Sequence, residues 1–184
     1  MHILAMIGSL RRRSYNRMTY ETVRELLPDG VTVEAADLSG IPVFNPDVLD
    51  EQGPPASVRR LKEQIAAADA VVFISPEYNF SVPGVLKNAI DWVSRPPAEQ
   101  PFRDKPVAIM GVSTGRLGTG RMQYHLRQIC VFLEVHPLAK PEVMIGLCRE
   151  KFDAQGHLSD EASRELIRAQ LEALAAWVER LHRE

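Results

Sequence analysis

Five short apolar runs recur along the chain, and each is followed by a longer segment with a helical alternation of apolar and polar residues. The runs predict β-strands at residues 2–7, 31–36, 70–75, 107–112 and 141–146. The third and fourth runs are nearly continuous in apolar residues, which is typical of strands that are covered on both faces. The pattern therefore indicates a buried sheet.

The intervening segments carry apolar residues three and four positions apart, the spacing of one buried helix face. They are Val58, Leu61, Ile65 and Ala68; Val85, Leu86, Ala89, Ile90 and Val93; Met122, Leu126, Ile129, Cys130 and Leu133; and Leu166, Ile167, Leu171, Leu174, Val178 and Leu181. Strands that alternate with helices predict an α/β fold with a parallel sheet between two helical layers. Two strand orders fit, the flavodoxin-like order 2-1-3-4-5 and that of the dinucleotide-binding fold. In both, ligands bind beyond the carboxyl ends of the strands.

Residues 37–54, 94–106 and 146–158 follow neither pattern, and we expect them to be surface loops. None of the pieces between these loops is large enough to form a domain. We therefore expect residues 1–184 to form a single domain with one site.

Composition narrows the class of protein. Apolar residues make up 45% and charged residues 25% of the chain, as in ordinary globular proteins. The formal net charge of −2 disfavours nucleic acid as a partner, because a broad basic face is missing. Cys130 and Cys148 lack the spacing of metal ligands, and no apolar run suits a signal peptide or a membrane span. We expect a cytoplasmic protein without membrane insertion.

The first candidate loop, GSLRRRSYN at residues 8–16, lies between a predicted strand and a predicted helix. Gly8 permits a close backbone approach, Ser9, Ser14 and Asn16 offer side-chain donors, and Arg11 offers a charged one. With the positive end of the helix, these groups suit a phosphate. Neither GxGxxG nor GxxxxGK[ST] occurs here, which disfavours a pyrophosphate or triphosphate ligand. The alternative is that Ser14 merely caps the helix and the arginines are solvated.

The second loop follows the most apolar strand and begins SPEYNFSVPG at residue 75. Pro76 and Pro83 pin the turn between them. We expect the N–H groups of Glu77 and Asn79 to meet a polar ring edge and Tyr78 to offer a flat face. A plain turn with Asn79 in the left-handed conformation explains the same residues equally well.

The third loop, VSTGRLGTGRMQ at residues 112–123, is rich in glycine and hydroxyl groups. Gly115, Gly118, Ser113 and Thr114 form a donor-rich cradle along which a planar ring can lie. Such turns are common in unrelated proteins. All three loops nevertheless fall on one edge of the predicted sheet, where a phosphate site beside a flat polar-edged slot describes a mononucleotide of flavin size.

Three segments, GSLRRRSYNR, SPEYNFSVPGVLKNAIDWVSRP and GRLGTGRMQYHLRQ, resemble the NADPH-dependent FMN reductase family in sequence, order and separation. Within the family, the likeness is greatest to bacterial NAD(P)H quinone reductases also described as chromate reductases. It extends from residue 2 to about residue 180. The resemblance implies a flavodoxin-like fold, bound FMN, and a hydride donor that is NADPH or NADH.

The resemblance also implies which residues bind FMN. They are Ser9, Arg11, Ser14, Tyr15 and Asn16 in the first loop, Pro76, Glu77, Tyr78 and Asn79 in the second, and Ser113, Thr114, Gly115 and Gly118 in the third. The chain departs from the family at Arg13, where a small or acidic residue is usual, and at Thr119, which replaces a glycine. We therefore assign the phosphate to Arg11 and leave Arg12 and Arg13 unassigned, either solvated or available to the phosphates of an incoming nicotinamide.

The same resemblance implies the reaction, a ping-pong transfer of hydride from NAD(P)H through FMN to quinones, chromate, azo compounds or ferric chelates. The flavin carries this chemistry, so we expect no catalytic side chain and no metal. The alternatives are a flavodoxin-type electron carrier, which usually has a strongly acidic surface, and a reductase that supplies reduced FMN to a partner monooxygenase.

The resemblance further implies a homodimer or homotetramer. Arg121, Tyr124 and Glu142 are the residues that it places at a subunit contact, through hydrogen bonds between chains. Arg121 and Tyr124 share a helical side with Gln128. A solvated helix face accounts for the same spacing.

Overall fold

A computed structural model describes residues 1–183. Its strands are β1 (His2–Ile7), β2 (Thr32–Ala35), β3 (Ala70–Ile74), β4 (Pro106–Val112), β5 (His136–Pro137) and β6 (Val143–Ile145). They form one parallel sheet in the order β2-β1-β3-β4-β5, and β6 also pairs with β4. The flavodoxin-like order expected from the sequence is confirmed.

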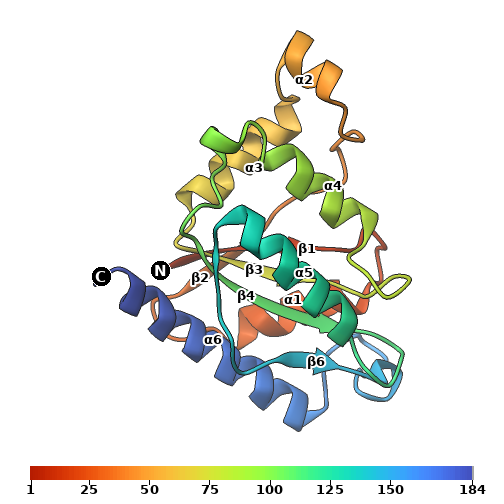
Figure 1. The fold of residues 1–184 in the computed structure, drawn as a ribbon. Coiled ribbons are helices and arrows are strands. Elements are labelled where there is room, and N and C mark those ends of the chain that lie inside the picture. Colours follow the sequence, from red (N-terminus) through yellow and green to blue (C-terminus); the bar gives the residue numbers. More distant parts are fainter. Residues whose placement is uncertain (184) are drawn as a thin grey trace.

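Helices cover both faces of this sheet (Figure 1). They are α1 (Tyr15–Glu25), α2 (Pro46–Gln52), α3 (Ala56–Ala67), α4 (Gly84–Val93), α5 (Gly120–Leu133) and α6 (Glu161–Leu181), with single 3₁₀ turns η1 (Pro97–Glu99) and η2 (Cys148–Glu150). Helices α1 and α6 pack on one face, and α3, α4 and α5 pack on the other.

Side chains of β1 alternate between the two layers, as the pleat of a strand requires. Leu4 and Met6 join the core beneath α3, α4 and α5. Ile3 and Ala5 join the core beneath α1 and α6. Each predicted apolar helix stripe faces one of these cores, so the sheet is covered on both sides and its carboxyl edge is left for a site.

One segment expected to be a loop contains a helix. Within residues 37–54, α2 begins after Asn45, whose side-chain oxygen accepts a hydrogen bond from the Asp47 N–H at 3.0 Å. Pro46 occupies the first helical position, where its missing N–H costs nothing. An asparagine N-cap followed by proline is a sequence signal for a helix N-terminus, so the prediction of a wholly irregular segment was wrong. The other two segments each contain one short 3₁₀ turn.

The fifth position of the sheet is divided between two short strands. β5 pairs with the start of β4, and β6, which corresponds to the predicted strand 141–146, pairs with its end. Between them, the Gln170 side-chain amide donates to the Ile109 carbonyl at 3.1 Å and to the Pro141 carbonyl at 2.7 Å. From the other face, Gln123 donates to the Val143 carbonyl at 2.8 Å. Two buried amides thus bond backbone groups at the break.

In residues 1–183, no helix has both the length and the apolar character required to cross a lipid bilayer.

Candidate functional site

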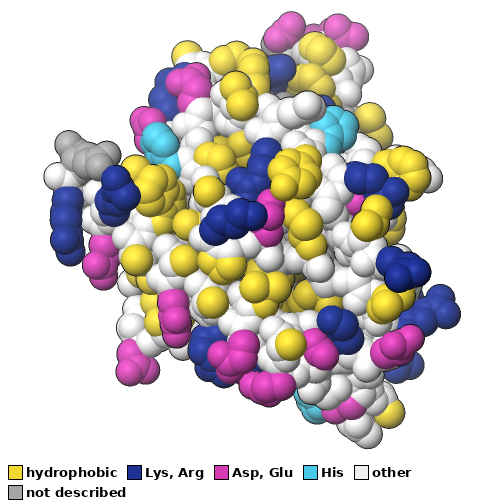
Figure 2. All heavy atoms as spheres, turned by 60° about the horizontal axis from the view of Figure 1, so that its bottom comes forward, with side chains coloured by type: hydrophobic (Ala, Val, Ile, Leu, Met, Phe, Trp, Pro, Cys, Tyr) yellow, Lys and Arg dark blue, Asp and Glu magenta, His cyan; other side chains and the backbone are white. Residues whose placement is uncertain are grey.

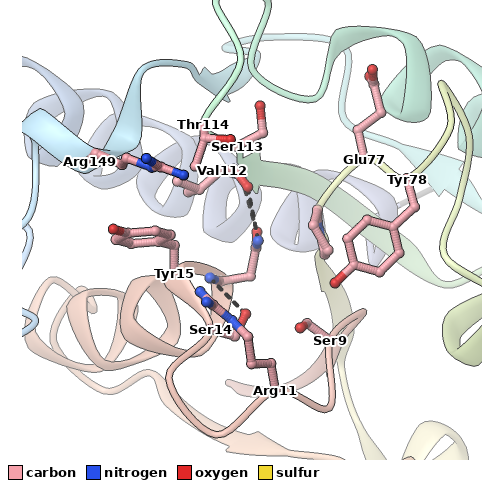
Figure 3. A pocket seen from close by; sticks show the side chains of 12 residues that line it. Ser9, Arg11, Ser14, Tyr15, Glu77, Tyr78, Val112, Ser113, Thr114 and Arg149 are labelled. Atoms are coloured by element: carbon pink, nitrogen blue, oxygen red, sulfur yellow. Dashed lines mark hydrogen bonds between the residues drawn. The ribbon is translucent and has the colours of Figure 1, made fainter.

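The loops that follow β1, β3 and β4 enclose a cavity of about 530 Å³ at the carboxyl edge of the sheet (Figure 3). This volume is in the range of small-molecule sites. Its walls are formed by Ser9, Arg11, Ser14, Tyr15, Asn16, Pro76, Glu77, Tyr78, Val112, Ser113, Thr114 and Arg149. The structure therefore brings together most of the residues predicted from the three loops, and it adds Arg149.

Donors gather at the end of the cavity nearest α1. The Ser14 hydroxyl oxygen accepts a hydrogen bond from the Asn16 N–H at 3.2 Å, and its own hydrogen stays free to be donated. Ser9 is 5% exposed, and its hydroxyl has no hydrogen-bond partner within residues 1–183. Arg11 and Arg149 add positive charge beside the first turn of α1, which carries unpaired N–H groups. Ser14 therefore caps the helix and still suits an anion, so the two readings of this residue are compatible.

Asn16 has a structural role that the sequence did not reveal. Its side-chain amide donates to the Val112 carbonyl at 2.9 Å and accepts from the Val112 N–H at 3.0 Å. β3 pairs with β4 only as far as Met110, so Asn16 takes the place of a strand at the next position. The amide is 2% exposed and fully engaged. Asn16 thus ties the first loop to the end of β4.

Gly8 also serves the scaffold. Its N–H donates to the Ile74 carbonyl at 3.0 Å, and a side chain there would collide with the Ser75 hydroxyl. The glycine expected to approach a ligand is needed instead for the close approach of the ends of β1 and β3.

The second loop is a tight turn closed by two backbone hydrogen bonds between Tyr78 and Ser81, of 3.1 and 2.9 Å. Asn79 and Phe80 have positive φ angles of 50° and 65°, the signature of a type I′ turn. The predicted left-handed Asn79 is confirmed, although Asn79 is not on the cavity wall. The Glu77 and Asn79 N–H groups have no acceptor within residues 1–183, and the Tyr78 side chain turns toward the cavity in Figure 3.

The Glu77 side chain points away from the cavity and fixes the start of α5. Its carboxylate accepts the Met122 N–H at 3.0 Å and pairs with the Arg121 guanidinium, whose Nε lies 2.6 Å away. Thr119 gives this helix no side-chain cap, so Glu77 supplies one from another loop. Arg121 also stacks on the exposed Phe80 ring, 3.6 Å from its centroid. The second loop and α5 are therefore held as a unit.

In the third loop, Ser113 and Thr114 face the cavity, whereas the predicted Gly115 and Gly118 do not. The Ser113 hydroxyl donates to the Gly118 carbonyl at 2.6 Å, which closes the loop. Gly118 has a φ of 61°, and a side chain there would lie 2.8 Å from the Met144 carbonyl. Gly118 thus allows the loop to pack on β6, so it shapes the site without forming its wall.

Arg149 reaches the cavity from η2, in a segment that was expected to be an ordinary loop. Two backbone hydrogen bonds fix that segment against the third loop, from Leu147 N–H to the Gly115 carbonyl at 3.1 Å and from Cys148 N–H to the Ser113 carbonyl at 3.2 Å. The sequence does contain a signal for Arg149, because the segment that carries it directly follows a predicted parallel strand, which ends at the same edge of the sheet.

These features fit a mononucleotide with a planar ring. Hydroxyl groups, arginines and a helix N-terminus suit one phosphate. The other end offers the Tyr78 side chain and backbone N–H groups without acceptors. In flavodoxin-like sheets this edge, at the switch point between the first and third strands, is where FMN binds. The fold and cavity thus define a flavodoxin-like nucleotide-binding protein.

Comparison with known proteins specifies the family. Residues 1–150 match the NADPH-dependent FMN reductase family. The chain is 59% identical over 179 residues to an NAD(P)H-dependent FMN reductase of Pseudomonas aeruginosa, covering 97% of this chain and 96% of that protein. It is 44% identical over 183 residues to a quinone reductase of Escherichia coli K12, with coverage of 98% and 97%. The chain belongs to the NADPH-dependent FMN reductase family.

A solved structure agrees with this assignment. FerB of Paracoccus denitrificans, a flavoenzyme NAD(P)H:(acceptor) oxidoreductase, is similar to this chain with a TM-score of 0.88 and 32% identity over 97% of both chains.

Proposed function

We propose that this chain is an FMN-dependent NAD(P)H oxidoreductase that reduces quinones and other small acceptors. The observation that carries the proposal is the cavity at the carboxyl edge, with phosphate donors at one end and free backbone donors beside Tyr78 at the other. The names of the relatives, which are quinone reductases and an FMN reductase, support the same activity. We also propose that residues 1–184 act as one domain.

In this proposal, Ser9, Arg11 and Ser14 hold the phosphate, with the first turn of α1 behind them. The Glu77 N–H group donates to the polar edge of the ring, Tyr78 covers its face, and Asn79, beside the cavity wall, offers its N–H group from the same turn. Ser113 and Thr114 form the opposite wall. The loops are kept in position by Tyr15, Asn16, Pro76, Gly115 and Gly118.

When bound, FMN supplies a two-electron carrier that accepts a hydride from NAD(P)H and passes it to the acceptor. With one proton from solvent, a quinone becomes a hydroquinone and NAD(P)H becomes NAD(P)⁺. The chain itself contributes binding, orientation and partial exclusion of water. Its Glu77 carboxylate is already paired with Arg121 and turned from the cavity, so it does not act as a general base.

The test is the visible absorption spectrum of the purified protein, followed by steady-state oxidation of NADH and NADPH with a panel of quinone, azo, chromate and ferric acceptors. We expect a yellow protein with flavin absorption and acceptor-dependent oxidation of NAD(P)H. A colourless preparation that takes up no added FMN would end this proposal.

A second candidate is a flavin reductase that releases reduced FMN to a partner enzyme. The name of the Pseudomonas aeruginosa relative favours it. Gel filtration of the FMN-loaded protein separates the two functions, because a prosthetic FMN stays with the protein and a substrate FMN is lost. Retention through the column supports the quinone reductase.

We propose that the chain assembles as a homodimer or homotetramer through the exposed side of α5. Tyr124, Val131 and Phe132 are exposed there, at 59%, 79% and 53%. Within the chain, the Tyr124 hydroxyl donates to Glu142 at 2.9 Å and Arg121 pairs with Glu77, so these residues would meet a second copy with their own bonds already formed. Light scattering of wild type and Phe132→Ser tests this assembly, since a monomeric wild type would refute it. A cytoplasmic location is part of the proposal, supported by the nicotinamide donor, which cells recycle internally.

A further inference from the structure

A second cavity of about 470 Å³ adjoins the first at its phosphate end. The two cavities share Arg11, Tyr15 and Arg149, so one ligand can extend from one cavity into the other. The walls found only in the second cavity include Arg13, Phe152 and Asp153. We call it the arginine pocket.

The charge of the arginine pocket is unbalanced. The guanidinium groups of Arg11, Arg13 and Arg149 make no hydrogen bond or ion pair with any residue in 1–183. By contrast, Arg24, Arg103, Arg121 and Arg164 each pair with a carboxylate. Figure 2 shows Lys and Arg side chains gathered along the right-hand edge, the end toward which β4 and β6 point in Figure 1. Because the proposed function assigns Arg11 to the FMN phosphate, Arg13 and Arg149 remain for a second ligand, and the pocket suits a phosphate group with two negative charges.

The carboxylate on the wall, Asp153, offsets only one of the three positive charges. Its two oxygens are engaged in its own turn, with the His157 N–H at 2.8 Å and the His157 ring nitrogen at 3.1 Å. The turn is held by an Asp153–His157 backbone bond and by Gly156, whose backbone lies against Met18. The wall is thus an ordered hairpin that leaves the arginines free.

The pocket also has an aromatic side. The Tyr15 and Phe152 rings lie 5.1 Å apart between centroids, tilted by 52°, and both line the cavity. Arg11 lies over the Tyr15 ring at 5.7 Å. Flat apolar faces beside unpaired arginines are suited to a purine nucleotide, because the base stacks while the phosphates pair.

We propose that the arginine pocket binds the adenosine 2′-phosphate portion of NADPH and that Arg13 sets a preference for NADPH over NADH. The inference rests on the proposed function, in which the nicotinamide must reach the ring end of the first cavity. A dinucleotide whose nicotinamide lies over the ring of bound FMN, and whose pyrophosphate passes outside the first loop, places its adenosine end in the arginine pocket. Arginine is the residue that accommodates a 2′-phosphate, whereas a carboxylate free to accept from the ribose 2′-hydroxyl favours NADH. Here the Arg13 guanidinium is unpaired, and the Asp153 carboxylate already accepts two hydrogen bonds from His157.

The binding test uses the FMN-loaded protein and adenosine 2′,5′-bisphosphate as the probe, measured by calorimetry. Arg13→Gln is compared with Arg12→Gln, a neighbouring exposed arginine outside both cavities. We expect wild type and Arg12→Gln to bind the probe alike, and Arg13→Gln to bind it roughly tenfold or more weakly. AMP, which lacks the 2′-phosphate, binds all three proteins equally. Equal binding of the bisphosphate by wild type and Arg13→Gln would overturn the proposal.

Kinetics provide the second readout. Arg13→Gln should raise KM for NADPH roughly tenfold with kcat unchanged, and leave KM for NADH within about twofold. Equal losses with both donors contradict an Arg13–phosphate contact. The proposal would also be overturned if the protein bound FAD more tightly than FMN and Arg13→Gln abolished this difference. That result would assign the pocket to the adenylate of FAD. If the protein binds FMN and reduces quinones but shows no preference for NADPH that depends on Arg13, this inference alone is refuted. If the wild type binds no FMN, the proposed function itself is refuted.

Discussion

Replacement of Asn16 by leucine tests the bond between the first loop and the end of β4. Leucine keeps the branched shape and the number of heavy atoms, although it is larger, but it can neither donate to the Val112 carbonyl nor accept from its N–H. Both backbone groups belong to a residue that is 1% exposed, and β3 offers them no partner. The substitution thus removes two hydrogen bonds without opening a large cavity.

The expected loss of unfolding free energy follows from burying polar groups without hydrogen-bond partners. Each backbone group that loses its partner costs about 1–3 kcal/mol if it stays dry. The adjoining cavity lets water reach part of this site, which lowers the sum. We expect Asn16→Leu to lose about 2–4 kcal/mol of unfolding free energy.

Urea unfolding of the FMN-free protein, followed by circular dichroism, measures this loss. Asn88→Leu is the matched control, since the Asn88 amide also makes two backbone hydrogen bonds, with Phe44 N–H and the Pro42 carbonyl, both at 2.8 Å. Those groups lie in a partly exposed loop that water can reach, so we expect a loss of about 1 kcal/mol. Asn16→Leu should also weaken FMN binding, and Asn88→Leu should not. Equal losses in the two variants would refute the reasoning.

Three further predictions concern other parts of the molecule. Arg11→Ala should weaken FMN binding by about 1.5–3 kcal/mol, measured by flavin fluorescence titration, and unchanged affinity removes Arg11 from the site. Burial raises the pKa of Cys130 to about 12 and also raises the pKa of Cys148. Native protein should therefore show no rapid reaction with a disulfide reagent at pH 8, and unfolded protein should show two reacting thiols. The Ser163 hydroxyl and N–H lower the pKa of Asp160, the N-cap of α6. Its stabilisation is present above the usual carboxyl pKa and is lost as pH falls below about 4, so Asp160→Ala should cost about 1 kcal/mol at pH 7 and less at pH 3 in thermal melts.

The sequence predicted the position of the site because the signals were local. Strands with continuous apolar residues are buried in the centre of a parallel sheet, and the loops after them must meet at one edge. The turn with Asn79 could be inferred from the tolerance of asparagine for positive φ. Ser9, Arg11 and Ser14 followed from their place before a helix.

The sequence could not assign roles that depend on distant contacts. Asn16 was read as a ligand donor because it lies beside Ser14, but its amide binds a residue 96 positions away. The sequence places Gly118 in a cradle for the ring, but the need for glycine comes from the Met144 backbone on β6, which a side chain at this position would meet. Arg149 follows the last strand, outside the loops after the first, third and fourth strands that the sequence singles out, although every strand of a parallel sheet ends at the same edge.

The divided fifth strand has a consequence for how copies of this chain can associate. An exposed sheet edge is a template on which another chain can add a strand and begin to aggregate. Here that edge consists of a two-residue and a three-residue strand, and Pro141 lies between them without an N–H. Gln170 meanwhile occupies the Ile109 carbonyl at the break. This edge therefore offers no continuous ladder for strand addition, so self-association through strand pairing is left to the opposite edge at β2.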